Sequence, residues 1–388
     1  SGTDIAELPG VIRRDDQAIF TRALEVGETS DTLFMNAAEV VGGSGGYTDG
    51  TVGYIYFGEG KDSVMAVGIQ KNGADDASVR FVEGRYLDIV VSPSAVPREL
   101  TVFLCSGPLE LLEGFNEELQ SARIQIPDFR KGGNGHWPGK VYTRGEIAPD
   151  TAAFVTDILT LPVPNPWKRN MRVIDMAFLD NTTAVVSTFE GDLWLVDGII
   201  GNLGRMAWKR IASGLYEPMS IEVHAGQIYV FGKEGIIRLH DLNGDGEVDF
   251  YENFCDLMQE PPESYAWAAD MVFSEKDNSF IIALGAAVNA RPGITRPIMT
   301  GFRAGSNHSG TIMRISSDGK RADVVATGFR MPFLGVNPLT GGITATDQQG
   351  NYVSSTPVYV VEEGDFFGVP ATAHRNDKKK KKKPLTWI

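Results

Sequence analysis

The stretch that decides the fold of this chain is PMSIEVHAGQIYVF, Pro218–Phe231. Apolar and polar residues alternate before the His-Ala-Gly turn, and a short apolar run follows it, which is the pattern of two short strands joined by a tight turn. The second strand opens with Gly, a polar residue, and then apolar, aromatic and apolar residues. GDLWLV at 191–196 opens in the same way, and weaker versions occur in SFIIALG (279–285) and GGITATDQQG (341–350).

A similar segment precedes each of these strands: DMAFLDNTTAVVS, PMSIEVHAG, ADMVFSEKDNS or LGVNPLTGG. The unit of strand, turn and strand recurs every 35 to 65 residues, and we count about four units between residues 172 and 370. Repeats of this length with several strands each are typical of β-propeller blades, which protect their sheet edges by radial repetition. A propeller generally has more blades. Either the chain stops within the propeller, or its N-terminal half supplies strands to it.

The residues before the repeat are also rich in strand patterns, in GTVGYIYFGEG, DSVMAVGIQ, ASVRFVEGRYLDIVVS and ELTVFLCSG. They predict a β-sandwich or jelly-roll-like module. LELLEGFNEELQSA is compatible with a short helix or an irregular loop, and KGGNGHWPGK predicts a loop. The three prolines of LPVPNPWK disfavour both helix and strand pairing. The predicted all-β chain is therefore an N-terminal module at 1–165, propeller blades at 166–374, and a lysine-rich linker with the start of a further strand at 375–388.

The charge balance argues against nucleic acid as a partner. Acidic residues outnumber basic ones by 50 to 36, which gives a net charge of −14. Six of the basic residues form the run Lys378–Lys383, so the rest of the chain is more acidic still. Such a surface repels phosphate backbones. For the lysine run itself, a solvated linker is favoured over a segment that binds an anionic surface.

The two cysteines, Cys105 and Cys255, occur without a C-x-x-C or C-x-x-C-H motif, which excludes covalent haem and a zinc-thiolate site within this sequence. Whether they form a disulfide stays open. No apolar run reaches the length of about 18 residues that a transmembrane helix needs. The N-terminal SGTDIAELPG lacks a basic-then-apolar signal, so we expect that any export signal was removed or lies upstream.

DLNGDGEVDFYE, Asp241–Glu252, has the spacing of an EF-hand calcium loop, with Gly246 at the sharp turn. The residues before it, GIIRLH, alternate like a strand, whereas YENFCDLM after it is compatible with a short helix. Strand, loop and helix do not make a paired EF-hand, so the sequence predicts a structural Ca²⁺ rather than a calcium sensor. An acidic turn without metal is the alternative. The predicted ligands are the side chains of Asp241, Asn243, Asp245, Asp249 and Glu252 and the backbone carbonyl of Glu247.

Five motifs follow one another in the segment 310–370. They are G-x-apolar-x-R-apolar-x-x-D-G-K at 310–320, a turn of the G-[LF]-R-N-P type at 328–332, N-P-x-T-G-x-apolar at 337–343, D-x-x-G at 347–350, and [YF]-G-x-P at 367–370. In order and spacing, this segment resembles the late blades of the soluble quinoprotein glucose/sorbosone dehydrogenase family. That resemblance implies a propeller that binds pyrroloquinoline quinone (PQQ) and oxidises a small sugar or polyol.

A wider resemblance rests on RFVEGRYLDIVV, TRGEIAPD, DILTLPVPNPWK, GDLWLVDGI and RLHDLNGDGEVDFYENF. These segments are similar to a bacterial family of large exported propeller proteins, some of which carry a cytochrome c domain. The resemblance implies a periplasmic, cell-surface or secreted location, and a cytochrome c domain or protein as electron acceptor. PLTWI at the end of the sequence looks like the start of another strand in that family, which implies that the chain is cut short.

Arg330 stands where the resembled quinoprotein family has an arginine that contacts PQQ. Its guanidinium is expected to pair with a quinone carboxylate or with the charge of the reduced cofactor. Met331 replaces the asparagine expected beside it. Asp347 and Gln348 fall where the family's loop faces the cofactor, and an acidic turn is the alternative reading of this pair.

Oxidation of an alcohol also needs a base for the hydroxyl proton. The family takes a histidine from just before a strand that matches ADMVFSEKDNSFIIALG, but ESYAWAADM in this sequence contains none. His308 or Asp270 is the substitute that we expect, although His308 also fits an ordinary loop histidine at a strand start. The remaining histidines suggest no cluster: His136, His224, His240 and His374.

Two functions therefore remain open. The first is an extracytoplasmic, quinoprotein-type sugar or polyol dehydrogenase, which the late-blade motifs favour. The second is a non-catalytic propeller and β-sandwich that binds glycans or scaffolds other envelope proteins, which the missing histidine and Met331 favour.

Overall fold

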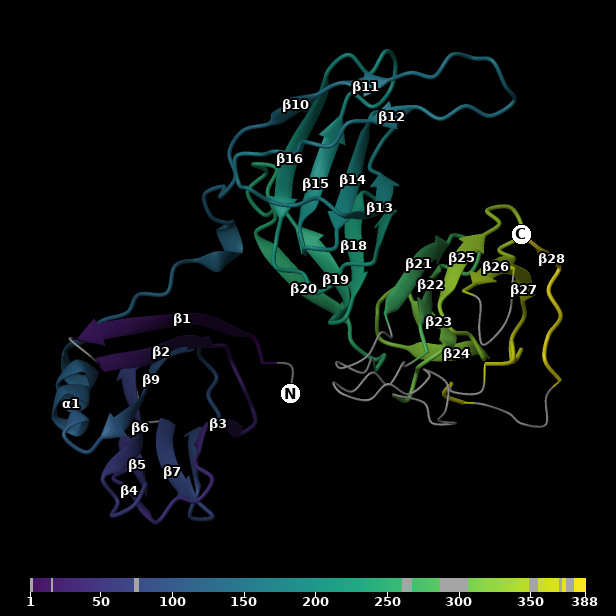
Figure 1. Ribbon diagram of the computed structural model, residues 1–388. Helices are drawn as coiled ribbons and strands as arrows, with labels where there is room; N and C mark the ends of the chain where they lie inside the picture. The colour runs from purple at the N-terminus through teal and green to yellow at the C-terminus, as the bar shows by residue number, and fades with distance from the viewer. Residues whose placement is uncertain are drawn as a thin grey trace. The chain divides into compact units, whose positions relative to one another are not determined.

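The computed structural model describes residues 3–14, 17–72, 77–259, 267–286, 306–348, 355–369, 372–374 and 380–388. The chain divides into two compact units, Ser1–Phe129 and Arg130–Ile388, which we describe separately (Figure 1). Both consist mainly of antiparallel strands, which confirms the predicted all-β class. The units divide after Phe129 rather than near residue 165, because the short strand β10 (Val141–Thr143) pairs with β16 (Met206–Ala212) of the second unit.

The first unit is a sandwich of two antiparallel sheets, as predicted. The larger sheet has the order β1-β2-β9-β6-β5-β4 and the smaller has the order β3-β8-β7. Alternate side chains of both sheets, among them Ile55, Val67, Leu87 and Ile89, are fully buried between them. The strands are β1 (Ile5–Arg14), β2 (Gln17–Val26), β3 (Leu33–Glu39), β4 (Gly46–Thr48), β5 (Val52–Phe57), β6 (Ser63–Asn72), β7 (Ala77–Val82), β8 (Tyr86–Val91) and β9 (Arg98–Pro108).

LELLEGFNEELQSA forms a helix, α1 (Leu111–Ser121), which settles the helix-or-loop question left by the sequence. Phe115 and Leu119 of α1 pack on Ile19 and Phe103 of the larger sheet. Gly68 of β6 lies directly beneath the helix, where a Cβ atom would come within 2.8 Å of Leu119. A glycine therefore allows the close approach of helix and sheet.

The described residues of the second unit form four successive antiparallel sheets, each an up-and-down meander of four strands, with β10 added at the outer edge of the first. This number of units matches the repeat count made from the sequence. A 3₁₀ turn (Phe129–Lys131) spans the start of the unit, and β11 (Gly145–Glu146) pairs with β12 (Ile158–Leu159) outside the four sheets. The first sheet is completed by β13 (Val173–Phe178), β14 (Thr183–Thr188) and β15 (Leu193–Asp197).

The second sheet consists of β17 (Ser220–His224), β18 (Gln227–Gly232), β19 (Gly235–His240) and β20 (Phe250–Cys255). The third consists of β21 (Ala268–Ser274), β22 (Ser279–Leu284), β23 (Thr311–Ser316) and β24 (Ala322–Thr327). The fourth consists of β25 (Pro332–Val336), β26 (Ile343–Asp347), β27 (Pro357–Val361) and β28 (Thr386–Trp387). YENFCDLM was compatible with a helix, but its first residues belong to β20, because pairing with β19 satisfies their backbone groups.

The four sheets pack face to face through apolar clusters. Val185 and Val230 lie in the cluster between the first two sheets, and Ile281 and Tyr359 lie in the cluster between the last two. The first strands of successive sheets, β13, β17, β21 and β25, lie next to one another. Meanders stacked in this manner, with their first strands adjacent, have the architecture of β-propeller blades.

The first strands also run in the same direction. Ser220 contacts Asp270 and Met271, and Glu222 accepts the N–H of Phe273, so β17 and β21 are parallel. We call the end of the sheets at which β17, β21 and β25 begin the entry end. Chain segments that precede these strands or connect the second and third strands of each sheet lie there. The loop between β19 and β20 lies at the opposite end of its sheet.

Candidate functional site

Four chain segments meet at the entry end of the third and fourth sheets. The N–H of Gly285 donates to the carbonyl of Trp267, and the N–H of Ala286 donates to the carbonyl of Arg330. Gly310 in turn bonds to the carbonyl of Gly285. Backbone hydrogen bonds thus tie the starts of β21, β23 and β25 to the end of β22. The segment carrying His308 and the segment carrying Arg330 are brought to this one end of the unit.

Arg330 and Asp347 are joined through the backbone. The Asp347 carboxylate, which is buried, accepts the N–H of Arg330 at 3.0 Å and the N–H of Met331 at 2.7 Å. Burial raises the pKa of Asp347 to about 6, although these amides favour the ionised form. Asp347 therefore holds the turn before β25 in place, and its carboxylate oxygens face the backbone.

The Arg330 side chain extends to Gln348, whose Oε1 accepts a hydrogen bond from Arg330 Nη1. Two of the three predicted cofactor-binding side chains, those of Arg330 and Gln348, are therefore in contact at the entry end. Together they offer N–H donors from a guanidinium and a carboxamide, which suits a planar anion or a carbonyl-rich ligand. Met331 points away from this pair into the core between the last two sheets and is 8% exposed. It supplies no polar group where the resembled family has an asparagine.

The His308 ring is fixed by a hydrogen bond from the main chain, so its proton-accepting nitrogen is not available to act as a base. Its Nδ1 accepts the N–H of Gln259 at 2.9 Å, so in the neutral ring the proton resides on Nε2. Its ring stacks against His374, with centroids 5.8 Å apart. Burial lowers the pKa of His308, and the neighbouring His374 adds to this effect. The ring is thus kept neutral, but its unprotonated nitrogen is already used.

Asp270, the second candidate base, lies within the row of first strands. Its Oδ2 accepts the N–H of Leu334 in β25 at 2.6 Å, and its Oδ1 accepts the N–H of Met271 at 2.8 Å. Oδ1 also contacts Ser220 Oγ of β17 at 3.1 Å. Burial raises the pKa of Asp270 to about 6. This value suits a general base, but the contacts are those of a group that links three strands.

The predicted calcium loop is a strand-to-strand connection that folds around its own acidic side chains. Asp241 accepts the N–H groups of Gly244 and Gly246, both at 2.7 Å. Asn243 accepts the N–H of Asp245, and Asp245 accepts that of Glu247. The left-handed backbone of Gly244 (φ +77°) and Gly246 (φ +81°) permits the tight winding.

The glycine-rich segment 131–137 covers one side of this acidic loop. Trp137 N–H donates to Glu247 Oε1 at 3.0 Å, and His136 N–H donates to Oε2. Gly133 N–H donates to Asp249 Oδ1 at 2.8 Å. The Glu247 side chain is 5% exposed, so these amides solvate a buried carboxylate. The side-chain oxygens of Glu247 are therefore engaged by backbone amides.

Glu252, the last of the predicted ligands, lies on β20 opposite Arg238 of β19. Its Oε2 accepts hydrogen bonds from Arg238 and contacts His240 Nε2 at 2.6 Å. Burial opposes ionisation of Glu252, but the hydrogen bonds from His240 and Arg238 outweigh it and lower the pKa. The carboxylate therefore fastens the β19–β20 hairpin. Among the residues that the structure describes, no group of three or more His, Cys, Asp or Glu side chains is arranged to hold a metal ion.

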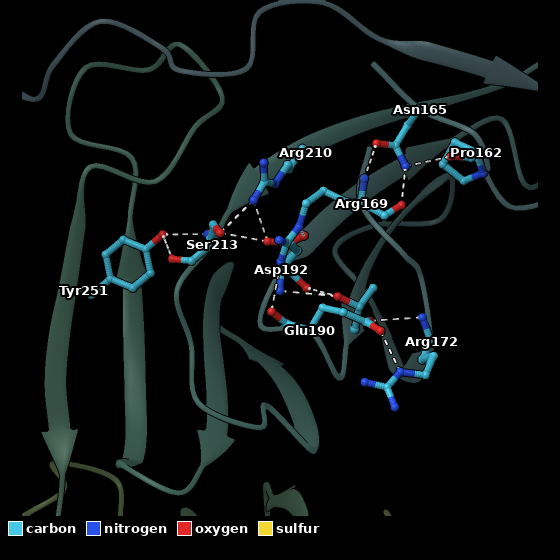
Figure 2. A network of polar contacts seen from close by, with 10 residues as sticks. Pro162, Asn165, Arg169, Arg172, Glu190, Asp192, Arg210, Ser213 and Tyr251 are labelled. Carbon is cyan, nitrogen blue, oxygen red and sulfur yellow. Dashed lines mark hydrogen bonds and ion pairs between the residues drawn. The ribbon is translucent and has the colours of Figure 1, made fainter. Parts of the chain in front are cut away.

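Asp192 was missed by sequence reasoning. It is fully buried between β14 and β15 and accepts hydrogen bonds from Arg169 Nε and Arg210 Nη2, each at 2.6 Å, and from Ser213 Oγ at 2.8 Å (Figure 2). Arg210 also lies over the Trp137 ring, 4.3 Å from its centroid. The one available signal was the acidic residue in the Glu-Gly-Asp turn before LWLV, and turn residues of that kind are common.

These features define an all-β protein whose second unit has β-propeller architecture. The described residues contain no helix that combines the length and the apolarity needed to cross a membrane. No known family model matches the sequence, and no curated protein matches it.

Solved structures give distant matches. One is a protein from Thermus thermophilus assigned as an oxidoreductase (glucose dehydrogenase), with 16% identity and a TM-score of 0.42 over 56% of this chain and 70% of that chain. Another is the PQQ-bound form of aldose sugar dehydrogenase from Streptomyces coelicolor, with 14% identity and a TM-score of 0.41 over 57% and 69%. A third, a protein of unknown function from Bacteroides thetaiotaomicron, has 8% identity and a TM-score of 0.33 over 89% and 72%.

Proposed function

We propose that this protein is a quinoprotein-type dehydrogenase-like propeller that acts outside the cytoplasm on a small sugar or polyol. The observation that carries the proposal is the contact of Arg330 with Gln348 at the entry end, where the late-blade motifs of the sequence converge. When bound, PQQ would supply the two-electron acceptor that protein side chains lack. Arg330 and Gln348 would hold its carboxylate and carbonyl oxygens, and Asp347 would fix the turn that carries Arg330.

The fit is good for cofactor binding and weaker for proton transfer. His308 uses Nδ1 as an acceptor for Gln259, and Asp270 accepts hydrogen bonds from Leu334 and Met271. A base role for either residue requires those contacts to exchange when substrate binds. This observation favours a second candidate function, a propeller that binds glycans or envelope proteins without catalysis. A cytochrome c domain or protein as electron acceptor belongs to the first proposal only.

The experiment that tests these functions separates binding from turnover. Purified protein is titrated with PQQ in the presence of Ca²⁺, with quinone absorbance as the readout, and dye reduction is then measured with aldoses and polyols. Arg330→Ala should weaken PQQ binding at least tenfold, whereas Arg321→Ala, an exposed arginine of the β23–β24 turn, should leave it unchanged. PQQ binding without dye reduction would support the non-catalytic candidate. Absence of both binding and turnover would reject the dehydrogenase proposal.

We also propose that the loop 241–249 binds a structural Ca²⁺. One support is the oxygen-rich set of potential ligands, Asp241, Asn243, Asp245 and Asp249. The other is the row of backbone amides from segment 131–137, which bind the Glu247 carboxylate so that it does not compete for the ion. A calcium ion at this place favours an oxidising, calcium-rich compartment outside the cytoplasm. Chelator-treated protein should release or absorb heat on addition of Ca²⁺ and should melt at a higher temperature. Calorimetry without heat, together with an unchanged melting temperature, would reject the site.

A further inference from the structure

Three carboxylates follow one another along the row of first strands, and each accepts a backbone N–H from the next sheet. Ser220, which is 1% exposed, lies between two of them. Its Oγ is 2.9 Å from Asp175 Oδ2 and 3.1 Å from Asp270 Oδ1. The three backbone contacts are Asp175 Oδ2 with Ile221 N–H at 2.8 Å, Glu222 Oε2 with Phe273 N–H at 3.0 Å, and Asp270 Oδ2 with Leu334 N–H at 2.6 Å.

The hydrogen-bond donors at Ser220 do not suffice for two ionised carboxylates. A serine hydroxyl has a single proton, and the shorter contact assigns it to Asp175. Met271 N–H donates to the same Oγ at 3.1 Å, so it supplies no proton between Oγ and Asp270 Oδ1. An ionised Asp270 would therefore set lone pairs against lone pairs in a buried position. A proton on Asp270 Oδ1 removes the conflict, because the carboxyl then donates to Ser220 Oγ.

We propose that Asp270 keeps a proton that it donates to Ser220, and that loss of this proton loosens the junction of β13, β17 and β21. This protonated contact between Asp270 and Ser220 does not depend on a cofactor or on Ca²⁺. It gives the second unit a stability that increases on mild acidification, which is the reverse of the usual behaviour of paired carboxylates.

The strands around the three carboxylates Asp175, Glu222 and Asp270, which we call the triad, supply mainly negative charge. Asp175 comes from β13, Glu222 from β17 and Asp270 from β21. Among the described residues of the adjoining strands β14, β22 and β25 there is no titratable side chain, and β18 contributes Tyr229. His224, at the far end of β17, faces Glu275.

Glu222 titrates in the same pH interval as Asp270. Burial raises the pKa of Glu222 to about 7, and the charges of Asp175 and Asp270 add to this effect. Its ionisation therefore increases the repulsion within the triad as the pH rises.

The direction of the pH effect follows from the raised pKa of Asp270, about 6 in the folded protein against an ordinary value of 3.8. The folded chain then binds more protons than the unfolded chain. The stabilisation is complete below pH 4 and is lost as the pH rises through 6. For this one group the folding equilibrium constant falls by roughly a hundredfold between pH 4 and pH 8. Other carboxylates titrate as well, so the measurement must be a comparison with a variant.

The test compares wild-type protein with Asp270→Asn, whose amide donates to Ser220 at every pH. Urea unfolding is followed by tryptophan fluorescence, which reports on the second unit alone because all six tryptophans lie after residue 129. The ratio of the two unfolding constants should change by about tenfold or more between pH 5 and pH 8, in favour of the variant at high pH. Asp323→Asn, an exposed aspartate of β24, is the matched control and should show a constant ratio.

A constant ratio for Asp270→Asn would overturn the proposal, since Asp270 would then be ionised throughout. If this variant does not fold, hydrogen exchange of the wild-type protein decides. After correction for intrinsic rates, the amides of Ile221, Met271 and Leu334 should exchange faster at pH 8 than at pH 5.5, and those of β22 should not. Equal protection of these amides at both pH values would also overturn the proposal.

Discussion

The guanidinium of Arg210 lies between the ring of Trp137, 4.3 Å from its centroid, and the buried carboxylate of Asp192 at 2.6 Å. One arginine therefore connects the segment that covers the acidic loop with the charge cluster of the first sheet. Arg169 provides the second cation for Asp192. A single buried acid is thus neutralised by two arginines that are 41 positions apart in the chain (210 − 169).

Replacing Asp192 by Asn should destabilise the second unit strongly. The change leaves Arg210, which is 6% exposed, without its carboxylate, and removal of one partner from a buried ion pair generally costs about 3–5 kcal/mol. Urea unfolding followed by tryptophan fluorescence measures the effect. Asp180→Asn, in an exposed turn of the same sheet, serves as the control and should change stability by less than about 1 kcal/mol. A similarly small loss for Asp192→Asn would contradict the structural role assigned to the cluster.

Substitutions of Asp245 and Glu252, two residues of the acidic motif, should differ in their effect on calcium binding. Asp245→Asn removes a charged ligand and should weaken Ca²⁺ binding by about tenfold or more. Glu252→Gln should leave the affinity unchanged, because Glu252 is engaged with Arg238 and His240, but it should lower stability by about 1 kcal/mol. Isothermal calorimetry and thermal melts of the two variants measure both effects. Loss of Ca²⁺ affinity in Glu252→Gln would restore the full EF-hand ligand set expected from the sequence.

Gly310 should tolerate no side chain. It has φ +68°, and a Cβ atom would come within 2.2 Å of Thr372 Cγ2 and 2.6 Å of the carbonyl oxygen of Phe329. Gly310→Ala combines a left-handed backbone with overpacking and should destabilise by about 3 kcal/mol. Gly226→Ala shares the positive φ of +74° but meets nothing within 4 Å, so a loss of about 1 kcal/mol is expected. Equal losses in urea unfolding would show that backbone strain alone matters.

Cys105 and Cys255 should not form a disulfide with each other. Both are free, and each is buried in an apolar cluster of its own, Cys105 with Phe103 and Phe115 and Cys255 with Ile236 and Met258. Burial raises the pKa of Cys105 to about 11, so the thiolate fraction at pH 8 is roughly a hundredfold below that of an ordinary thiol. Titration with a thiol reagent should detect two slow groups in the folded protein and two fast groups in urea. Detection of fewer than two thiols after unfolding without reductant would refute this prediction.

The sequence predicted the strands of the second unit well, because turn residues and apolar alternation repeat in each sheet. It left α1 undecided, because LELLEGFNEELQSA contains an interior glycine, and packing of Phe115 and Leu119 on the larger sheet decides for a helix. It was misleading at β20, where pairing with β19 determines the conformation of a short ambiguous run. Local pattern carries no information on such partners.

In the candidate site, too, local motifs were informative and contacts with distant partners were not. Contact between Arg330 and Gln348 was foreseeable, since both belong to motifs with fixed spacing. The engagement of Asp270 with Ser220 and Leu334 was not, because these partners are 50 and 64 positions away. The same holds for Asp192, whose partners Arg169 and Arg210 occur in segments without a recognisable motif. Long-range polar contacts depend on how the sheets stack, which the sequence pattern specifies only in outline.

The covering of the acidic loop by segment 131–137 sets a limit for dissecting the chain. A fragment that starts at residue 166, where the prolines suggest a natural cut, would lack the amides that solvate Glu247 and Asp249, the aromatic partner of Arg210, and the edge strand β10. It would expose a buried carboxylate on an otherwise intact sheet. The shortest version of the second unit suited to expression and crystallisation therefore begins near Arg130.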